Sequence, residues 1–152
     1  EVLLQQKKEA EEKNLSILFE SAETPMVLAD ANKVKEVLMN LLDNTMKFSP
    51  ENGKITIHSV QSGNFIHIEV SDTGRGISEQ NQSLLFCKFQ QAGESLLPRD
   101  TTKGTGLGLY IAKLMIEKMG GTIYLESSNE NAGSTFVFTL PVAPTEQVKI
   151  AL

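Results

Sequence analysis

The chain has 152 residues, 40% of them hydrophobic and 22% charged, which is enough length and the usual composition for one globular domain. Its 14 basic and 19 acidic residues give a net charge of −5, and only two are arginines, so we expect no nucleic-acid-binding role. The single cysteine excludes an internal disulfide, and no apolar run reaches the roughly 20 residues of a membrane span. We therefore expect a cytoplasmic domain that makes no membrane contact through this segment.

The first thirty residues contain three predicted elements. Residues 1–14 have a weak amphipathic pattern that predicts a helix, which we interpret as a linker or docking element. Residues 15–20 and 26–30 are short apolar runs on either side of a turn that contains Pro25, and we predict that they pair as a hairpin.

The strongest periodic pattern predicts a helix over residues 31–48, with Asp30 as its N-cap and Pro50 beyond its end. Its apolar face is formed by Val34, Val37, Leu38, Leu41, Leu42 and Thr45. A polar stripe beside that face contains Glu36, Asn40, Asn44 and Lys47. Asparagine is a poor helix former, but its amide oxygen can bind a hard cation, and a lysine ammonium can bind phosphate. Taken alone, the stripe is more simply interpreted as a solvated polar face.

Two alternating runs, residues 54–60 and 64–72, predict a β-hairpin. Asp72 has the parity of the apolar face of the second strand, which is formed by Ile66, Ile68 and Val70. The glycines that follow, Gly74 and Gly76, permit sharp turns and close approach of a ligand. An inward carboxylate can accept a hydrogen bond from an exocyclic amine such as that of adenine, whereas an ordinary turn needs no such group.

The second half of the chain alternates predicted helices and strands. Residues 79–89 and 106–119 have helical periodicity, and residues 90–105 between them predict a long loop rich in Gly, Ser, Pro and Thr. The apolar positions of the second helix are Leu107, Ile111, Leu114 and Met115. Residues 122–127 and 134–140 predict the last two strands. This order predicts an α/β fold with helices on one face of a mainly antiparallel sheet.

A glycine-rich motif, Gly104-Thr-Gly-Leu-Gly-Leu109, joins the long loop to the second helix. Backbone N–H groups at a helix N-terminus can bind a phosphate. The motif is not a Walker loop, because no Gly-Lys-Ser/Thr follows, and its spacing does not match a dinucleotide-binding fingerprint. A lone motif of this kind is only a weak indication of function.

Four motifs follow one another along the chain: Asn40-Leu-Leu-Asp-Asn44-Thr-Met-Lys47-Phe48, Asp72-Thr-Gly-Arg-Gly76, Phe86 with Phe89, and Gly104-Thr-Gly-Leu-Gly-Leu109. Together they resemble the N, G1, F and G2 boxes of the catalytic ATP-binding domain of sensor histidine kinases, over about residues 15–140. The wider family, shared with gyrase, mismatch-repair and heat-shock chaperone ATPases, has a two-layer α/β sandwich with ATP between helices and a mobile lid. The resemblance implies that fold here, with ATP and Mg²⁺ as cofactors.

The resemblance also implies roles for individual residues. On the helix at 31–48, the implied nucleotide contacts are Asn40, Asn44, Lys47 and Phe48, with Asn44 as the Mg²⁺ ligand. Asp72 is implied to accept the adenine amine, with Gly74 and Gly76 forming the turn beside the base. The lid is implied to be residues 90–105, and the contacts in it and just after it are Lys103, Gly104, Thr105, Gly106, Leu107, Gly108 and Leu109. The adenine pocket is completed by Ile77, Leu85 and Thr135.

In the gyrase-like relatives a glutamate at the position of Asn40 activates the attacking water, and an amide cannot accept that proton. The resemblance therefore implies a kinase that transfers the γ-phosphoryl group to a histidine on a separate helical dimerisation domain, with a response regulator as the further partner. We expect the isolated domain to be inactive without that histidine-bearing domain. His58 and His67 are predicted to be solvent-facing strand residues, and Cys87 a small packing residue.

Two other functions fit the same motifs: a nucleotide-sensing module without transfer activity, and a serine kinase of the anti-sigma type. Many family members have an arginine just after the F box, where this chain has Gln90-Gln91, so Lys103 or Arg99 is expected to substitute at the γ-phosphate.

We predict three parts of the chain: a linker helix from a missing dimerisation and histidine domain at 1–14, the ATP-binding domain at 15–141, and a C-terminal tail at 142–152.

Overall fold

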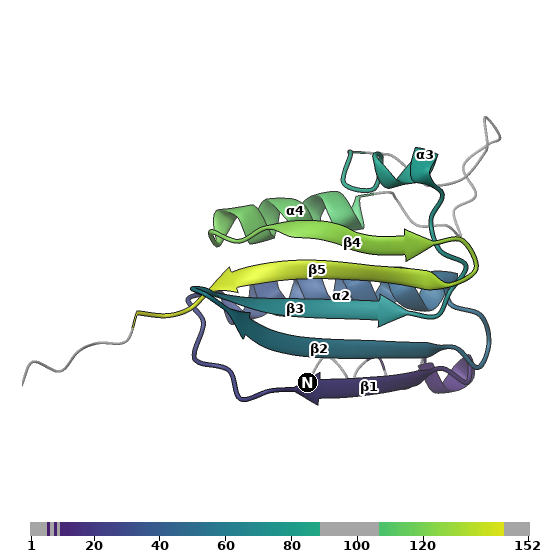
Figure 1. Ribbon diagram of the computed structural model, residues 1–152, viewed down its shortest axis with the longest axis horizontal. Helices are drawn as coiled ribbons and strands as arrows, with labels where there is room; N and C mark the ends of the chain where they lie inside the picture. The colour runs from purple at the N-terminus through teal and green to yellow at the C-terminus, as the bar shows by residue number, and fades with distance from the viewer. Residues whose placement is uncertain (1–5, 7, 9, 89–106, 145–152) are drawn as a thin grey trace, which may run out of the picture.

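The computed structural model describes residues 6, 8, 10–88 and 107–144, which form a five-stranded sheet with helices on one face (Figure 1). The strands are β1 (Ser16–Ser21), β2 (Lys54–Ser62), β3 (Phe65–Asp72), β4 (Ile123–Asn129) and β5 (Gly133–Pro141). The helices are α2 (Ala31–Phe48), α3 (Glu79–Gln82) and α4 (Gly108–Lys118). The predicted two-layer α/β fold is confirmed for these residues.

The strand order is β1-β2-β3-β5-β4, and only the β1–β2 pair is parallel. The β2–β3 hairpin closes between Ser62 and Phe65, so its turn consists of Gly63 and Asn64. Gly63 has φ +59°, the left-handed conformation that such a two-residue turn requires. β1 and β2 are parallel because α2 connects them by a crossover. The sheet is therefore mixed and mostly antiparallel, as the sequence predicts.

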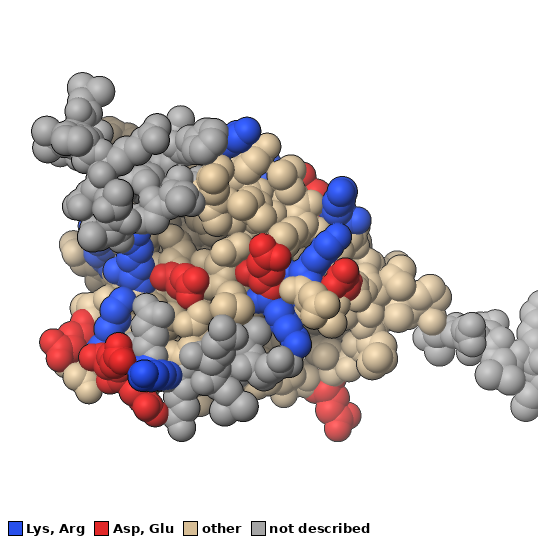
Figure 2. Space-filling view, turned by 180° about the vertical axis from the view of Figure 1, so that it is seen from behind, with Lys and Arg blue, Asp and Glu red and all other residues tan. Residues whose placement is uncertain are grey.

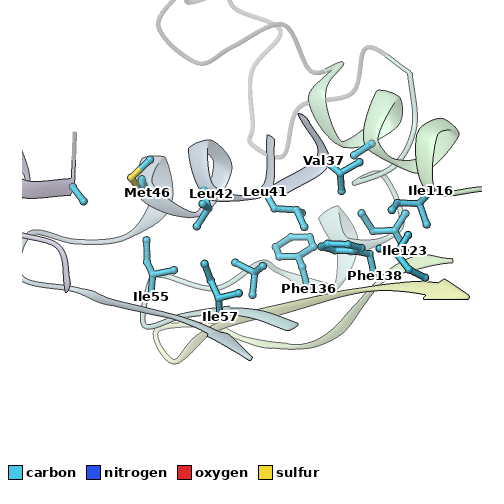
Figure 3. Close-up of a cluster of buried hydrophobic side chains, with 14 of the residues drawn as sticks. Val37, Leu41, Leu42, Met46, Ile55, Ile57, Ile116, Ile123, Phe136 and Phe138 are labelled. Carbon is cyan, nitrogen blue, oxygen red and sulfur yellow. The ribbon is translucent and has the colours of Figure 1, made fainter. Parts of the chain in front are cut away.

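The predicted helix at 31–48 is confirmed at both ends. The Asp30 carboxylate accepts hydrogen bonds from the N–H groups of Asn32 at 2.9 Å and Lys33 at 3.2 Å, which satisfies donors that the first helical turn leaves unpaired. The buried residues of α2 are Val37, Leu41, Leu42, Thr45 and Met46. Figure 3 shows the apolar side chains of this face directed at Ile55, Ile57, Phe136 and Phe138 of the sheet. This packing fixes the rotation of α2 and thereby the position of its polar stripe.

The predicted hairpin between residues 15–20 and 26–30 is wrong. β1 pairs with β2, with Ile17 opposite Ile55 and Phe19 opposite Ile57. In the second segment only Val27 forms a bridge, with Val142, while Leu28 is 62% exposed. Pairing with β2 places β1 beside the main core. The apolar burial gained there outweighs the advantage that a local hairpin has from being close in sequence.

Three predictions in the second half of the chain are also corrected. The helix predicted at 79–89 is a single turn, Glu79–Gln82, and the Ser83 hydroxyl bonds back to the Gln80 carbonyl at 3.3 Å where the helix ends. Leu114 is 46% exposed, because α4 buries the face that carries Ala112 and Ile116. Cys87 is exposed, not packed.

The described residues near the two ends of the chain lie against the domain. Ala10 and Leu15 are buried in the main core, and Gln6 donates a 2.6 Å hydrogen bond to Asp43 of α2. Near the other end, the Ala143 N–H donates to the Met26 carbonyl at 2.8 Å. Gln6 and Ala10, inside the predicted linker, and Ala143, inside the predicted tail, therefore contact the folded domain.

Candidate functional site

A cavity lies between α2, the end of β3 and the start of β5, which meet at one end of the sheet (Figure 1). Its lining residues are Asn44, Thr45, Phe48, Asp72, Gly76, Ile77, Ser134 and Phe136. Asn44 and Phe48 come from the first predicted motif, and Asp72 and Gly76 from the second. The fold thus brings two motifs that are distant in sequence into one cavity.

Asp72 is the acidic residue of the cavity and is only partly exposed. Burial raises the pKa of its carboxyl, and hydrogen bonds from the backbone of Gly74 and Ser134 lower the pKa by less. The Gly74 N–H donates to Asp72 Oδ1 at 2.7 Å. The carboxylate is therefore held in place by the backbone of its own turn and of β5, with acceptor capacity remaining for a ligand.

Glycine is required where this turn packs against its neighbours. A β-carbon on Gly74 would lie 2.6 Å from Asp72 Oδ1 and 2.7 Å from the Phe48 carbonyl oxygen. Gly76 has φ +72°, and a β-carbon there would collide with the Asn129 carbonyl. On β5, Gly133 has φ +92°, and a β-carbon would collide with the Asp72 carbonyl. These close approaches leave no room for a side chain at any of the three positions.

The turn that connects β4 to β5 is hydrogen-bonded to the glycine turn. The Ile77 N–H donates to Ser128 Oγ at 2.8 Å, and the Asn131 N–H donates to the Arg75 carbonyl at 2.7 Å. Ser128 Oγ also lies 2.8 Å from Ser134 Oγ. Two walls of the cavity are thus joined through Ser128.

The structure places Ser134, not the predicted Thr135, at the cavity. The Thr135 hydroxyl lies 3.0 Å from the Ser71 hydroxyl, on the sheet face opposite to Phe136. Side chains alternate along a strand, so residue 134 shares the inward parity of Phe136 and residue 135 does not. This alternation was available in the sequence and identifies Ser134 without a structure.

Phe48 is flanked by two cations. Arg75 Cζ lies 4.7 Å from the centroid of the Phe48 ring, and Lys47 Nζ lies 5.9 Å from it. Cation–π contacts of this kind favour a defined ring position. Lys47 therefore lies beside a cavity-lining residue without itself lining the cavity.

Asn40, which does not line the cavity, lies beside the start of α4. A β-carbon on Gly108 would lie 3.6 Å from Asn40 Oδ1, so the N-terminus of α4 is adjacent to the predicted phosphate-binding position on α2. Leu107 precedes this helix, and Leu109 and Leu85 are half-buried and pack against the main core without lining the cavity. The predicted contacts Lys103, Gly104, Thr105 and Gly106, and the predicted lid at 90–105, lie outside the described residues.

The remaining predicted features lie away from the cavity. His58 and His67 are on the open face of the sheet, where His58 Nδ1 lies 3.6 Å from Glu69 Oε2. Within the described ranges, no cluster of three or more His, Cys, Asp or Glu residues has the geometry of a metal site. Figure 2 shows acidic and basic side chains interspersed over the helix-bearing face, as far as the structure describes it. None of the described helices is both long and apolar enough to span a bilayer.

Comparison with known proteins identifies the family and the fold. Residues 29–144 match the family described as histidine kinase-, DNA gyrase B- and HSP90-like ATPase. The chain belongs to this family. Those residues include the whole of α2, β3 and β5, and therefore every residue that lines the cavity.

Two relatives place the chain within the family. The chain is 37% identical over 142 residues to the non-motile and phage-resistance protein of Caulobacter vibrioides, covering 91% of this chain and 16% of the relative. It is 41% identical over 113 residues to the circadian input-output histidine kinase CikA of Synechococcus elongatus, covering 74% and 15%. The chain thus spans about a sixth of the length of these relatives.

The catalytic domain of the histidine kinase ThkA superposes with a TM-score of 0.78 at 33% identity, covering 94% of this chain and 90% of that domain. A structure of ThkA in complex with the response regulator TrrA superposes with a TM-score of 0.73 at 27% identity, covering 96% of this chain and 40% of that chain. The chain is therefore an ATP-binding catalytic domain of the histidine-kinase type.

Proposed function

We propose that the domain binds Mg-ATP in one orientation, with the base in the cavity described above and the phosphates beside the start of α4. The adenine lies at the base end, defined by Asp72, Ile77 and Ser134, and the phosphates lie toward the phosphate end, defined by Asn40 and Gly108. The observation that carries this proposal is the partly buried Asp72 carboxylate, fixed by backbone donors in the same cavity as Asn44.

The base end has the chemistry to select adenine. Adenine presents an exocyclic amine, which can donate to the Asp72 carboxylate, whereas guanine presents a carbonyl oxygen at the same ring position. Two acceptors facing one another in a partly buried site cost free energy, because neither finds a donor. Asp72 therefore favours adenine both by attraction and by rejection of the alternative.

The phosphate end has donors of two kinds. The first backbone N–H groups of α4 have no partner within the helix and carry the positive end of its dipole, so they suit an anion. Asn40 adds a side-chain amide beside Gly108, and Lys47 adds positive charge one turn beyond Asn44. The Asn44 amide oxygen fits a Mg²⁺ site that takes its other oxygens from phosphates and water, and the ion would neutralise phosphate charge there.

The same site suits a kinase better than an ATPase. At Asn40 an amide replaces the carboxylate that would deprotonate an attacking water, so bound ATP is protected from hydrolysis. We propose that the full-length protein is a cytoplasmic-facing protein histidine kinase and transfers the γ-phosphoryl group to a histidine on a helical dimerisation domain linked through residues 1–14. The ThkA complex with TrrA supports a response regulator as the further partner. Residues 15–141 would form the catalytic domain, and 142–152 a tail.

The test of nucleotide binding is calorimetry with ADP and GDP on the parent, Asp72→Asn and Asp30→Asn. Asparagine caps helices as well as aspartate does, so Asp30→Asn removes one carboxylate remote from the cavity and serves as the matched control. We expect Asp72→Asn to cost about 1.5–3 kcal/mol of ADP affinity, as the loss of a charge-assisted hydrogen bond. Unchanged ADP binding by Asp72→Asn, or a preference of the parent for GDP, contradicts the assignment.

A further inference from the structure

Ser128 connects the two walls of the base end by hydrogen bonds. It lies on β4, is half-buried, and does not itself line the cavity. Its hydroxyl oxygen is within hydrogen-bond distance of three groups: the Ile77 N–H at 2.8 Å, the Ser134 hydroxyl at 2.8 Å and the Gly133 carbonyl at 3.4 Å. Ile77 and Ser134 both line the cavity, although they are far apart in sequence.

The single hydroxyl hydrogen of Ser128 limits how its three contacts can be arranged. A backbone N–H can only donate, so Ser128 Oγ accepts from Ile77 and has one hydrogen of its own to give. Its two possible acceptors are Ser134 Oγ at 2.8 Å and the Gly133 carbonyl at 3.4 Å. Hydroxyl hydrogen bonds favour about 2.7–2.8 Å and weaken beyond 3 Å, so the contact with Ser134 is the stronger of the two, and either hydroxyl can donate in it.

The contact with Ser128 holds the Ser134 hydroxyl at the wall of the cavity. Ser134 is only 5% exposed, and its backbone already donates toward Asp72. When Ser128 donates in this contact, the Ser134 hydroxyl hydrogen faces the cavity as a donor beside the acceptor of Asp72. A donor next to an acceptor complements the amine and adjacent ring nitrogen of adenine, whereas guanine presents the reverse pair.

We propose that Ser128 is a positioning residue for base recognition, acting on both Ile77 and Ser134 through one hydroxyl. It ties the glycine turn to β5 and directs the hydrogen of Ser134 into the cavity, without touching the nucleotide. The inference rests on the proposed function, because it assumes that adenine occupies the base end. The β4–β5 turn lies at the same end of the sheet as the end of β3 (Figure 1).

The test compares Ser128→Ala with Ser127→Ala, a neighbouring serine on the same strand that is exposed and lies at a register shift of the β4–β5 pair. We expect Ser128→Ala to weaken ADP binding about five- to tenfold, as expected for one to two lost neutral hydrogen bonds, and Ser127→Ala to stay within about twofold of the parent. In Ser128→Ala the Ile77 amide, followed by NMR, exchanges with solvent faster than in the parent.

A second pair guards against a variant that folds poorly. Threonine and valine have nearly the same shape, so Ser128→Thr keeps the hydroxyl that Ser128→Val lacks. We expect the threonine variant to bind ADP several-fold more tightly than the valine variant, with both melting at similar temperatures. A merely structural hydroxyl would change the melting temperatures and leave the ADP affinity of folded protein unchanged, and that result overturns the proposal.

The outcomes also separate this inference from the proposed function. If the parent fails to bind ADP, the proposed function fails, and the inference with it. If the parent binds ADP and Asp72→Asn does not, but Ser128→Ala binds as well as Ser127→Ala, only the role of Ser128 is overturned.

Discussion

The base end and the phosphate end of the proposed nucleotide site are built by different means. At the base end, the end of β3, its glycine turn and the start of β5 are joined by hydrogen bonds of 2.7–2.8 Å, including those that fix Asp72 and Ile77. At the phosphate end, Asn40 and Gly108 are brought together by the packing of α2 beside α4. Base recognition is thus preorganised by backbone contacts within the sheet, whereas the phosphate contacts depend on the relative position of α2 and α4.

The largest loss of stability is expected at the base end, where the backbone leaves no space for an added β-carbon. In Gly133→Ala the new methyl group would collide with the Asp72 carbonyl, and φ +92° disfavours any β-carbon. Strain and displacement of β5 from β3 should together lower the free energy of unfolding by at least about 3 kcal/mol. Urea denaturation of the parent and the variant measures this difference.

Gly63→Ala is the matched control. Gly63 also has a positive φ, +59°, but nothing lies within 4 Å of an added β-carbon. We expect it to cost only about 1–2 kcal/mol, the price of the left-handed conformation alone. Equal losses in the two variants would show that the close contact of Gly133 with Asp72 contributes nothing to stability.

A titration of Asp72 separates recognition from stability at the base end. Burial raises the pKa of its carboxyl, so the folded protein favours the neutral form and burying the charge costs stability at neutral pH. As the pH falls through the raised pKa, that cost disappears, while the acceptor for the adenine amine is also lost. We therefore expect the parent to lose ADP affinity with falling pH at a higher pH than an exposed aspartate would.

The comparison variant for this titration is Asp72→Asn, which lacks the ionisable group. The ratio of its ADP dissociation constant to that of the parent removes the titration of the nucleotide itself. The ratio should approach a constant low value in acid, and the stability gap between the two proteins should narrow there. A ratio that stays the same from neutral pH down to the lowest pH at which both proteins remain folded would exclude the carboxylate as the acceptor.

The phosphate end is tested by Asn40→Glu. A carboxylate at this position can accept a proton from water, and general-base catalysis is typically worth 10²–10⁴-fold. We expect about 10- to 100-fold faster ATP hydrolysis by the isolated domain, because nothing else positions the water and the new charge repels phosphate. Asn40→Gln, which adds length without charge, should leave phosphate release unchanged at matched nucleotide occupancy. Faster release by both variants would show that side-chain length, not basicity, limits the rate.

The difference between the two ends also explains what the sequence could predict. The polar stripe of α2 follows from helical spacing and from the cap at Asp30. The order of Asn40, Asn44 and Lys47 along one side of α2 was therefore predictable. Likewise, strand parity directed Asp72 inward. Ser128 was not predictable, because its role depends on how a bulged β4 registers with β5 and meets a turn about fifty residues earlier.

Long-range pairing also accounts for the main error in the fold. The short apolar runs at the start of the chain favoured a local hairpin, but β1 pairs with β2 after an intervening helix. Local pattern reports which residues are apolar, not which strand lies beside the core. The misplacement of Thr135 was different in kind, since the parity of Phe136 and Phe138 already excluded it from the helix-facing side.

The smallest expected effect is the sharpest test of that parity. Ser134→Ala removes a hydroxyl that lines the cavity, and Thr135→Ala removes one that lies 3.0 Å from Ser71 on the opposite face of the sheet. We expect Ser134→Ala to cost about 1 kcal/mol of ADP affinity, the usual value of one neutral hydrogen bond. Thr135→Ala should leave ADP binding within error of the parent, because its lost contact is on the far side of β5. If instead Thr135→Ala weakens binding and Ser134→Ala does not, the assignment of the inward face at the start of β5 is reversed. The hydrogen bond from Ser128 to Ser134 then cannot influence the nucleotide.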